Sequence, residues 1–159
     1  MMDDELKAVA LVLIGLMGAV AVYPILAESR IVEPFSELGV LGPNMKIGDY
    51  PREVVVGERF NLYLYVGNHE GRAQYYRVLV KLGDRSMNVS DTTPLDAPVV
   101  ASWDFVLPNE SNSTLPITLS VGRAGLNQRL VFELWRYVDS GFIYHQRWNQ
   151  LWMNVTSTG

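Results

Sequence analysis

The strongest constraint in this sequence is a run without charged residues that extends from Ala8 to Ala27. At about 1.5 Å of rise per residue, a helix of this length spans roughly 30 Å, the thickness of the hydrocarbon core of a bilayer. Tyr23 lies near the far end of the run, where an amphipathic ring suits the membrane interface. The run therefore predicts one N-terminal transmembrane helix in contact with the lipid bilayer.

A cleavable signal peptide is the competing interpretation of this run. Such peptides carry a positive leading segment, an apolar stretch of about 7–15 residues and a small-x-small cleavage site. Here Asp3, Asp4 and Glu5 make the leading segment acidic, and the apolar run is longer. These two differences favour a retained anchor over a cleaved signal.

The orientation of the anchor depends on glycosylation motifs, because the flanking basic residues Lys7 and Arg30 balance each other. Four asparagines begin an N-x-S/T acceptor motif, whereas chance predicts about one. They are Asn88, Asn109, Asn112 and Asn154. Polar loops of β-proteins are also rich in these residue types, so the motifs have a second interpretation. The excess favours a cytoplasmic N-terminus, an extracellular C-terminal domain and location in the cell membrane.

The anchor also contains a candidate helix-packing surface. Gly15, Gly18 and Ala19 fall close together on one side of a helix, and Gly15 and Ala19 form a small-xxx-small pair. Small residues allow a second helix to approach closely in lipid, where packing drives association. Glycine and alanine are common in transmembrane helices in any case. The pattern nevertheless suggests other membrane protein subunits as partners.

Beyond residue 34 the pattern changes to the alternation of apolar and polar residues that is typical of half-buried strands. Phe60, Leu62, Leu64 and Val66 alternate with polar or aromatic residues, and three further segments repeat the pattern. The expected strands cover residues 35–41, 60–66, 76–82, 99–107, 115–121, 129–138 and 142–155. We expect a short hairpin connection at 139–141 and a β-bulge near residues 149–150.

About seven short strands without an amphipathic helix predict an antiparallel, immunoglobulin-like β-sandwich after the transmembrane helix. The four tryptophans, at positions 103, 135, 148 and 152, are expected to fill its core or to line one sheet face. The predicted divisions are a cytoplasmic N-terminus at 1–7, the transmembrane helix at 8–27, a linker at 28–33, the extracellular sandwich at 34–156 and a tail at 157–159.

A set of short motifs occurs in a fixed order through this domain. They are Phe35-Ser-Glu-Leu, Leu41-Gly-Pro, Asp49-Tyr-Pro, Val56-Gly-Glu, Gly67-Asn-His-Glu-Gly and Leu151-Trp-Met-Asn-Val. In these motifs the chain resembles the archaeal predicted-membrane-protein family called domain of unknown function 1616, as a short form with one membrane helix. The resemblance implies an archaeal envelope and an immunoglobulin-like sandwich. It supplies no known activity and no catalytic residue.

The residues themselves do not predict an active site. There is no cysteine, so disulfides, thiolate zinc sites and cysteine nucleophiles are excluded. A formal net charge of −4 argues against a nucleic-acid partner. His69, Glu70 and His145 lack the spacing of a zinc-protease helix, and a metal site would require the fold to bring them together. Asp84, Asp91 and Asp96 lack the pattern of a calcium loop. We therefore predict no enzyme, no metal, no cofactor and no small-molecule substrate.

Aromatic side chains offer the remaining candidate for recognition. Tyr63, Tyr65, Tyr75, Trp135 and Tyr137 fall on expected strands, some of them in the phase opposite to the buried residues. If they are exposed together, they form a patch suited to a protein or a glycan. The alternative is that both faces of these strands are covered within the fold, for example by the opening segment.

The expected function is that of a non-catalytic, membrane-anchored accessory or structural subunit of an archaeal envelope complex. Its helix and its sandwich would act through protein–protein contacts. One alternative is a pilin-like filament or surface-layer component, which would require processing near Lys7-Ala8. A second alternative is a glycan-binding or enzymatic ectodomain, which would require a deep pocket with convergent polar groups.

Overall fold

The computed structural model describes residues 3–28 and 33–157, which form two compact units, Met1–Glu33 and Pro34–Gly159. The first unit contains the helix α1, Asp4–Glu28. Asp4 and Glu5 occupy its first turn, where negative charge is favourable, and Lys7 pairs with Asp4 at 3.0 Å. The helix therefore begins four residues before the uncharged run.

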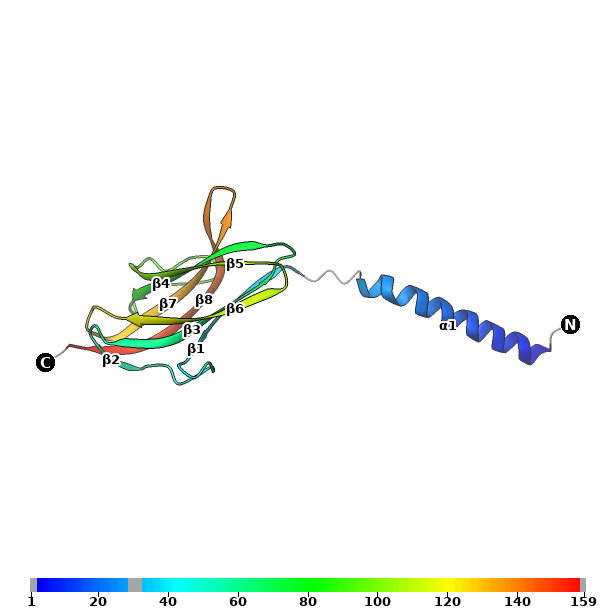
Figure 1. Ribbon diagram of the computed structural model, residues 1–159, viewed down its shortest axis with the longest axis horizontal. Helices are drawn as coiled ribbons and strands as arrows, with labels where there is room; N and C mark the ends of the chain where they lie inside the picture. Colours follow the sequence, from blue (N-terminus) through cyan, green and yellow to red (C-terminus); the bar gives the residue numbers. More distant parts are fainter. Residues whose placement is uncertain (1–2, 29–32, 158–159) are drawn as a thin grey trace. The chain divides into compact units, whose positions relative to one another are not determined.

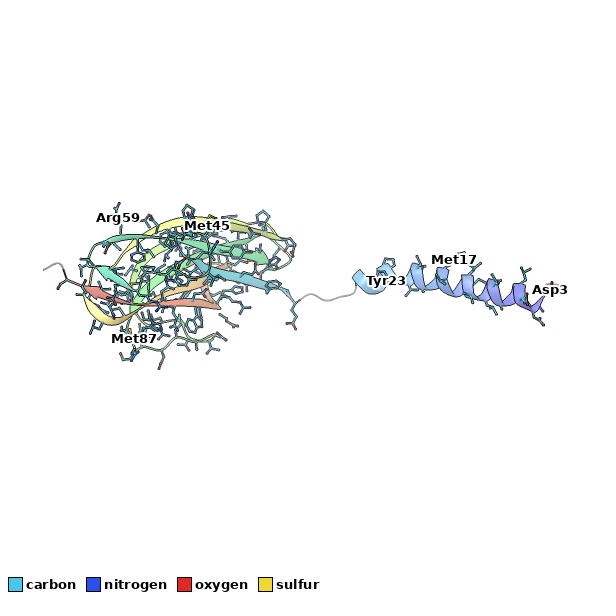
Figure 2. All side chains as sticks on the ribbon, turned by 90° about the horizontal axis from the view of Figure 1, so that it is seen from below. Asp3, Met17, Tyr23, Met45, Arg59 and Met87 are labelled. Carbon is cyan, nitrogen blue, oxygen red and sulfur yellow. The ribbon has the colours of Figure 1, made fainter. Side chains whose placement is uncertain are left out.

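The segment Asp4–Pro24 of α1 is long and apolar enough to cross a membrane, although a signal sequence at an N-terminus meets the same test. Within the helix unit, apolar side chains such as Met17 and Tyr23 are exposed (Figure 2). A Cβ atom added at Gly15 or Gly18 would meet nothing within 4 Å, so the backbone is open to close approach at both positions. These properties fit a helix that is surrounded by lipid or by other helices.

The second unit is a β-sandwich of two packed sheets (Figure 1). One sheet has three strands in the order β1-β3-β6, and the other has five in the order β2-β8-β7-β4-β5. The strands are β1 Phe35–Leu41, β2 Glu53–Val55, β3 Arg59–His69, β4 Gln74–Gly83, β5 Val99–Leu107, β6 Ser111–Ser120, β7 Gly125–Val138 and β8 Gly141–Thr156. This two-sheet arrangement confirms the predicted immunoglobulin-like sandwich.

The core lies between the sheets and is built from the residues that alternation predicts. Leu62, Leu64 and Val66 of β3 are fully buried, and Val78 and Val80 of β4 face them from the other sheet. Figure 2 shows side chains filling the space between the sheets. Since each buried aliphatic side chain contributes about 1.5–3 kcal/mol, this core dominates the stability of the domain.

Strand β2 is a feature that the sequence pattern missed. It has three residues and pairs with β8 in parallel, whereas every other described pairing is antiparallel. Three residues are too few to establish an alternation, and Pro51 marks the preceding segment as a turn. The sandwich therefore has eight strands rather than about seven.

The predicted bulge in the last strand lies at a different place. Leu134 is opposite Arg147, but the next residue, Trp135, is opposite Tyr144, so the additional residues are His145 and Gln146. Gln146 has a positive φ of 57°. The expectation of a bulge near residues 149–150 is wrong, because the bulge lies four residues earlier, and it directs His145 toward the interior.

The long connection between β4 and β5, residues 84–98, packs on the outer face of the five-stranded sheet. Leu95 is its buried anchor, with 1% of its surface exposed. Tyr144 donates a hydrogen bond to the Ser90 carbonyl (2.8 Å), and Trp148 Nε1 donates to Asp91 Oδ1 (3.2 Å). This connection, rather than the opening segment of the domain, covers part of the aromatic face.

Candidate functional site

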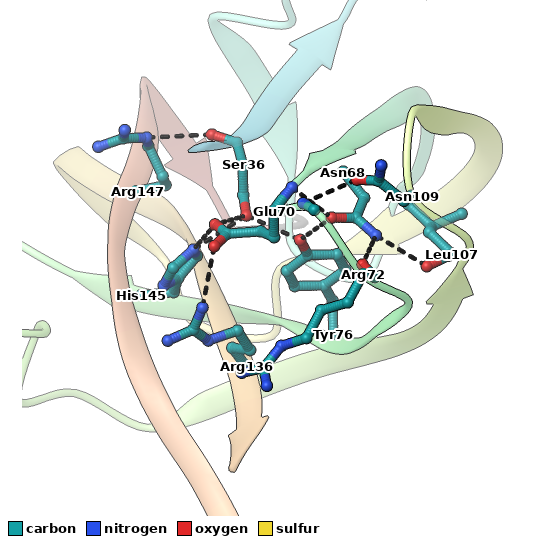
Figure 3. A network of polar contacts seen from close by, with 11 residues as sticks. Ser36, Asn68, Glu70, Arg72, Tyr76, Leu107, Asn109, Arg136, His145 and Arg147 are labelled. Atoms are coloured by element: carbon teal, nitrogen blue, oxygen red, sulfur yellow. Dashed lines mark hydrogen bonds and ion pairs between the residues drawn. The ribbon is translucent and has the colours of Figure 1, made fainter. Parts of the chain in front are cut away.

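Polar side chains from both sheets meet at the end of the sandwich where β1 begins (Figure 3). We call them the polar cluster: Ser36 of β1, Asn68 at the end of β3, Glu70 directly after it, Tyr76 of β4, Arg136 of β7 and His145 of β8. Ser36, Asn68 and Tyr76 are almost completely buried. Since buried polar groups are costly unless they are hydrogen-bonded, the partners of each group decide what the cluster does.

Glu70 is the centre of the polar cluster. Its Oε1 accepts a hydrogen bond from Ser36 Oγ (2.6 Å) and lies 2.9 Å from His145 Nε2, and its Oε2 accepts from Arg136 Nη1 (3.1 Å). Burial disfavours the charged carboxylate, but the hydrogen bonds from Ser36 and His145 and the charge of Arg136 outweigh it, so the pKa of Glu70 is below its ordinary value. Glu70 is therefore ionised at neutral pH.

Ser36, His145 and Glu70 are the residue types of a hydrolytic triad, but their geometry differs from one. In a triad the carboxylate binds one imidazole nitrogen and the hydroxyl binds the other. Here both Ser36 Oγ and Glu70 Oε1 lie 2.9 Å from the same atom, His145 Nε2. Ser36 is only 2% exposed. The arrangement holds strands together and does not present a nucleophile.

Asn68 connects the polar cluster to the neighbouring turns. Its Nδ2 lies within 3.0 Å of the carbonyl oxygens of Arg72, Leu107 and Pro108. Its Oδ1 accepts from the Glu70 backbone N–H and from the Tyr76 hydroxyl. Asn68 is a buried residue of β3, and Gly71 in the turn that follows adopts a positive φ of 77°.

The first strand is held at its beginning by the same cluster. Arg147 Nε donates to the Ser36 carbonyl (3.1 Å), so both the backbone and the side chain of Ser36 bind residues of β8. The Tyr76 hydroxyl lies 2.7 Å from Ser36 Oγ and adds a contact with β4. Strand β1, which follows α1 in the chain, is thereby bound to the opposite sheet as well as to β3.

The pKa values of the two histidines are shifted in opposite directions. Burial, together with Arg136 and Arg147, lowers the pKa of His145 despite the contact with Glu70. His69 lies outside the polar cluster, with Nδ1 2.7 Å from Glu110 and Nε2 3.4 Å from Glu37. The hydrogen bond to Glu110 is the main reason that the pKa of His69 is raised.

These shifts predict a stability maximum near pH 6.5, the ordinary histidine value. Below pH 6.5 the unfolded state binds more protons at His145 than the folded state does. The free energy of unfolding therefore decreases as the pH falls from 6.5 to the lowered pKa of His145 in the folded protein. Above pH 6.5 the folded state binds more protons at His69, so stability falls as pH rises through that residue's raised pKa. Thermal unfolding between pH 4.5 and 8.5 should show both slopes.

Single substitutions separate the two contributions. His145→Gln should flatten the acidic side of the profile, and His69→Gln should flatten the alkaline side. Below pH 4.5 protonation of Glu70 should add a further loss of stability in either variant. Two variant profiles that run parallel to that of the wild type would contradict these assignments.

His69 and His145 do not converge. Each is bound to its own carboxylates, and the described residues contain no group of three or more histidine, aspartate or glutamate side chains that could hold a metal ion. Asp84 and Asp91 have structural contacts in the 84–98 connection: Asp84 Oδ1 accepts from the Ser86 N–H, and Asp91 accepts from Trp148.

A second buried charge lies under the 84–98 connection. Glu133 is completely buried; its Oε2 lies 2.9 Å from Lys81 Nζ, and its Oε1 accepts from the Leu95 N–H (2.6 Å). Lys81 Nζ also donates to the Leu95 carbonyl (2.8 Å). Both ends of the ion pair therefore bind the backbone of the same loop residue, which fixes the loop on the sheet.

The five tyrosine and tryptophan residues of the expected patch lie on different sheets. Tyr63 and Tyr65 project from β3 on the outside of the three-stranded sheet, whereas Tyr75, Trp135 and Tyr137 belong to the five-stranded sheet. Tyr65 is held by a hydrogen bond to Glu37 (2.8 Å). A single patch of all five therefore does not form. Of the tryptophans, Trp103 packs against the core, and the other three are on β7 and β8.

A smaller surface does form across four strands of the five-stranded sheet, and we call it the aromatic row: Val106, Tyr75, Tyr137 and Phe142. Tyr75 is opposite Val106, and Tyr137 is opposite Phe142. The three ring centroids are separated by 5.0–5.7 Å. Val106 is 74% and Tyr137 is 42% exposed. The row lies near the end of the β7–β8 hairpin, which projects at one end of the sandwich (Figure 1).

Charged residues fix the geometry of the aromatic row. Arg77 binds Asp104 through two hydrogen bonds of 2.7 and 2.8 Å, and its guanidinium carbon lies 4.2 Å from the centre of the Phe142 ring. Tyr75 donates its hydroxyl to Asp104 (2.6 Å). The hydrogen bond to Asp104 raises the pKa of Tyr75, and that from Arg77 lowers the pKa of Asp104. The half-buried rings of Tyr75 and Phe142 are thus held in place before any partner binds.

The predicted glycosylation sites have different surroundings. Asn88 lies in the 84–98 connection, Asn109 in the turn between β5 and β6, and Asn112 on β6; all three are exposed. Asn154 of β8 is half-buried; its Nδ2 donates to Glu53 Oε1 (2.8 Å), and its Oδ1 accepts from the Asn127 N–H (2.9 Å). Attachment of sugar at Asn88, Asn109 and Asn112 remains a prediction, and Asn154 is the least accessible acceptor.

Three solved structures are similar to this chain at low sequence identity. A β-glucosidase from Listeria innocua in complex with glucose has 13% identity and a TM-score of 0.47, over 78% of this chain and 16% of its own. The CARDB domain of a Pyrococcus furiosus protein, in complex with di-metal ions, has 12% identity and a TM-score of 0.48, over 77% of this chain and 89% of its own. Spo0M, a sporulation control protein from Bacillus subtilis, has 11% identity and a TM-score of 0.48, over 77% of this chain and 50% of its own.

No curated protein matches the sequence. A family model does match, over residues 30–150, and its description is Domain of unknown function (DUF1616). The match spans the end of the linker and most of the sandwich, including all of the polar cluster and the aromatic row. It confirms the resemblance that the ordered motifs indicate. The protein therefore belongs to the DUF1616 family.

Proposed function

We propose that this protein is a membrane-anchored, non-catalytic binding subunit of a cell-envelope assembly, and that the aromatic row contacts the folded domain of a second membrane protein. The observation that carries the proposal is the row itself. Aromatic residues and arginine are enriched at the centres of protein interfaces, where a few anchors supply most of the binding energy. The rings of Tyr75, Tyr137 and Phe142, together with the fixed Arg77, have this composition.

The fixed geometry of the row supports a protein partner. Ordering flexible side chains on binding costs about 0.5–1.5 kcal/mol each. Because Asp104 already holds Tyr75 and Arg77, that cost is small here. The row is also beside a hollow of about 340 Å³ lined by Arg72, Gln74, Tyr137 and Asp139 among others, which would receive a projecting side chain of the partner.

The polar cluster supports the non-catalytic part of the proposal. The chemistry-bearing groups Ser36, Glu70 and His145 are used to bind β1 to both sheets. A strand that follows a membrane anchor transmits any force between the anchor and the domain. The contacts of Ser36 with β8 and β4 therefore oppose separation of β1 from the rest of the domain under such a force.

The helix supplies the second contact surface in this proposal. Gly15, Gly18 and Ala19 would allow a neighbouring transmembrane helix to approach, with the domain outside the cell and the N-terminus in the cytoplasm. Replacing Gly15 and Ala19 with leucine should weaken association with the partner in mild detergent, because the bulkier side chains separate the helices.

The orientation of the domain has its own test. Protease added to intact cells should cut the domain, and complete protection of the domain would contradict the orientation.

The test of the aromatic row compares two variants of the full chain purified from native membranes. A Val106→Asp, Tyr137→Asp double variant should lose its partner, because removal of one hot-spot anchor costs about 2 kcal/mol, roughly 30-fold in affinity. Ile47→Asp is the matched control, since Ile47 is 87% exposed in the loop after β1. An unchanged complex in the double variant, or equal loss in the control, would contradict the proposal.

A further inference from the structure

A hollow of about 470 Å³ lies beside β8 where the short β2 begins. Its lining comes from three parts of the chain: the segment before and into β2, the start of β7, and the second half of β8. The lining includes Arg52, Glu53, Asn127, Gln150, Trp152 and Asn154. A volume of this size is within the range of small-ligand sites, which is about 300–1,000 Å³.

The alternation of β8 decides which side chains face outward there. Leu151 and Met153 belong to the buried core, so Gln150, Trp152 and Asn154 project to the opposite face. An indole ring is thus flanked on both sides by a carboxamide. Trp152 is 40% exposed, whereas tryptophan in a sandwich is usually covered. The guanidinium carbon of Arg129 lies 5.4 Å from the Trp152 ring and helps to hold it in place.

The polar groups around the indole are held by one another. Asn154 Nδ2 donates to Glu53 Oε1, and Asn154 Oδ1 accepts from the Asn127 N–H. Gln150 Oε1 accepts from Arg129 Nε (2.7 Å). In the described part of the chain, Gln150 Nε2, Glu53 Oε2 and the guanidinium of Arg52 have no hydrogen-bond partner. Gln150 and Glu53 are each held through their Oε1 atom, so the hollow offers a positioned amide donor and a positioned carboxylate acceptor beside an apolar ring, together with the exposed guanidinium of Arg52.

We propose that this hollow binds neutral carbohydrate, one or two sugar residues in size. The C–H face of a pyranose ring packs on an exposed indole, while its hydroxyls use the amide and guanidinium donors and the carboxylate acceptor. The guanidinium groups of Arg52, Arg129 and Arg85, the last two within 6.0 Å of the centre of the Trp152 ring, outnumber the Glu53 carboxylate, which disfavours a metal cation. The site is separate from the aromatic row, so it does not depend on the proposed protein partner.

Sugar has two possible sources, because Asn154 also begins an acceptor motif. Both functional atoms of the Asn154 carboxamide are already hydrogen-bonded, so the amide serves as a wall of the hollow. The proposal is therefore a bound saccharide from outside the chain rather than one attached at Asn154. Intact-mass and peptide analysis of the protein from its native host should show Asn154 unmodified, and a glycan at Asn154 would overturn the proposal.

The binding test uses the full chain in phospholipid nanodiscs, because detergents with sugar headgroups would compete. The probes are methyl α-mannoside, methyl β-galactoside, cellobiose and diacetylchitobiose, observed by saturation-transfer NMR and titrated to millimolar concentration. At least one should bind the wild type, and Trp152→Ala should weaken that binding about tenfold or more. Absence of binding by all four probes would overturn the proposal.

Two further variants keep the result interpretable. Phe35→Ala removes a ring of similar exposure, 38%, from β1 of the other sheet and should leave sugar binding unchanged. Glu53→Gln retains the shape of the hollow but removes its carboxylate, and should weaken binding without changing the thermal midpoint. Equal weakening by Phe35→Ala, or full binding by Trp152→Ala, would overturn the assignment.

Discussion

Glu133→Gln is expected to lower the free energy of unfolding by about 3–5 kcal/mol, the cost of removing one partner from a buried ion pair. The substitution keeps the size of the side chain but leaves the ammonium of Lys81, 9% exposed, without a counter-charge. It also weakens the attachment of Leu95, whose N–H binds the Glu133 carboxylate. Denaturant unfolding measures the loss, and protease cleavage within residues 84–98 should become faster.

A double variant identifies the cause of that loss. Lys81→Met removes the unpaired charge, so Lys81→Met, Glu133→Gln should recover roughly half of the stability lost by Glu133→Gln alone. If the single substitution costs less than about 1 kcal/mol, the pair is not buried in the way described. If the double variant is less stable than the single one, charge burial is not the reason for the loss.

The second large effect is expected at the polar cluster. Glu70→Ala leaves Arg136 and His145 without their carboxylate and should cost about 3 kcal/mol. The loss should be largest in β1, because Glu70 binds Ser36 directly. Hydrogen exchange should therefore accelerate in the amides of β1 more than in those of β7, which lies in the centre of the other sheet.

The matched control for this substitution is Glu110→Ala. Glu110 also binds a histidine, His69, but its side chain is 65% exposed. A solvent-exposed ion pair contributes about 0–1 kcal/mol, so the control should change stability little. Equal effects of the two substitutions, or uniform acceleration of exchange across the domain, would contradict the role given to the polar cluster.

The strands were largely predictable because their periodicity is local. β1 and β5 have the predicted bounds, 35–41 and 99–107, and the bounds of the other long strands differ from the predicted ones by at most four residues at either end. Alternation is imposed by the pleat of each strand and needs no knowledge of the partner strand. β2 and the bulge at His145 were not predictable in this way, since both depend on which strand lies alongside β8.

Two members of the polar cluster, Glu70 and His145, were candidates from the sequence, and they do meet in the structure. The part played by Ser36 was missed, because Ser36 and His145 are 109 residues apart in sequence and meet only through the packing of the two sheets. One signal was present. Ser36 shares the inward phase of Val40, and Asn68 shares that of Val66, so two polar side chains stand where the pattern requires burial. Polar residues in a buried phase indicate a hydrogen-bonded cluster, although not its members on other strands.

The outer face of the five-stranded sheet shows the opposite case. Glu133 is in the outward phase of β7 and yet is completely buried, because residues 84–98 fold over it. Alternation cannot reveal a loop that packs on the far side of a sheet. The same loop limits how much of this face is exposed. Tyr63 and Tyr65 lie on the other sheet, so the aromatic row contains only part of the predicted patch.

Site-specific photo-crosslinking tests the proposed partner contact most directly. A photoreactive phenylalanine analogue is introduced at Tyr137 in the aromatic row or at Ile47 in the loop after β1, and whole cells are irradiated. The predicted result is a discrete adduct with another membrane protein from position 137 and none from position 47. An equal adduct pattern at both positions, or no adduct at position 137, would contradict the assignment of the aromatic row as the binding surface.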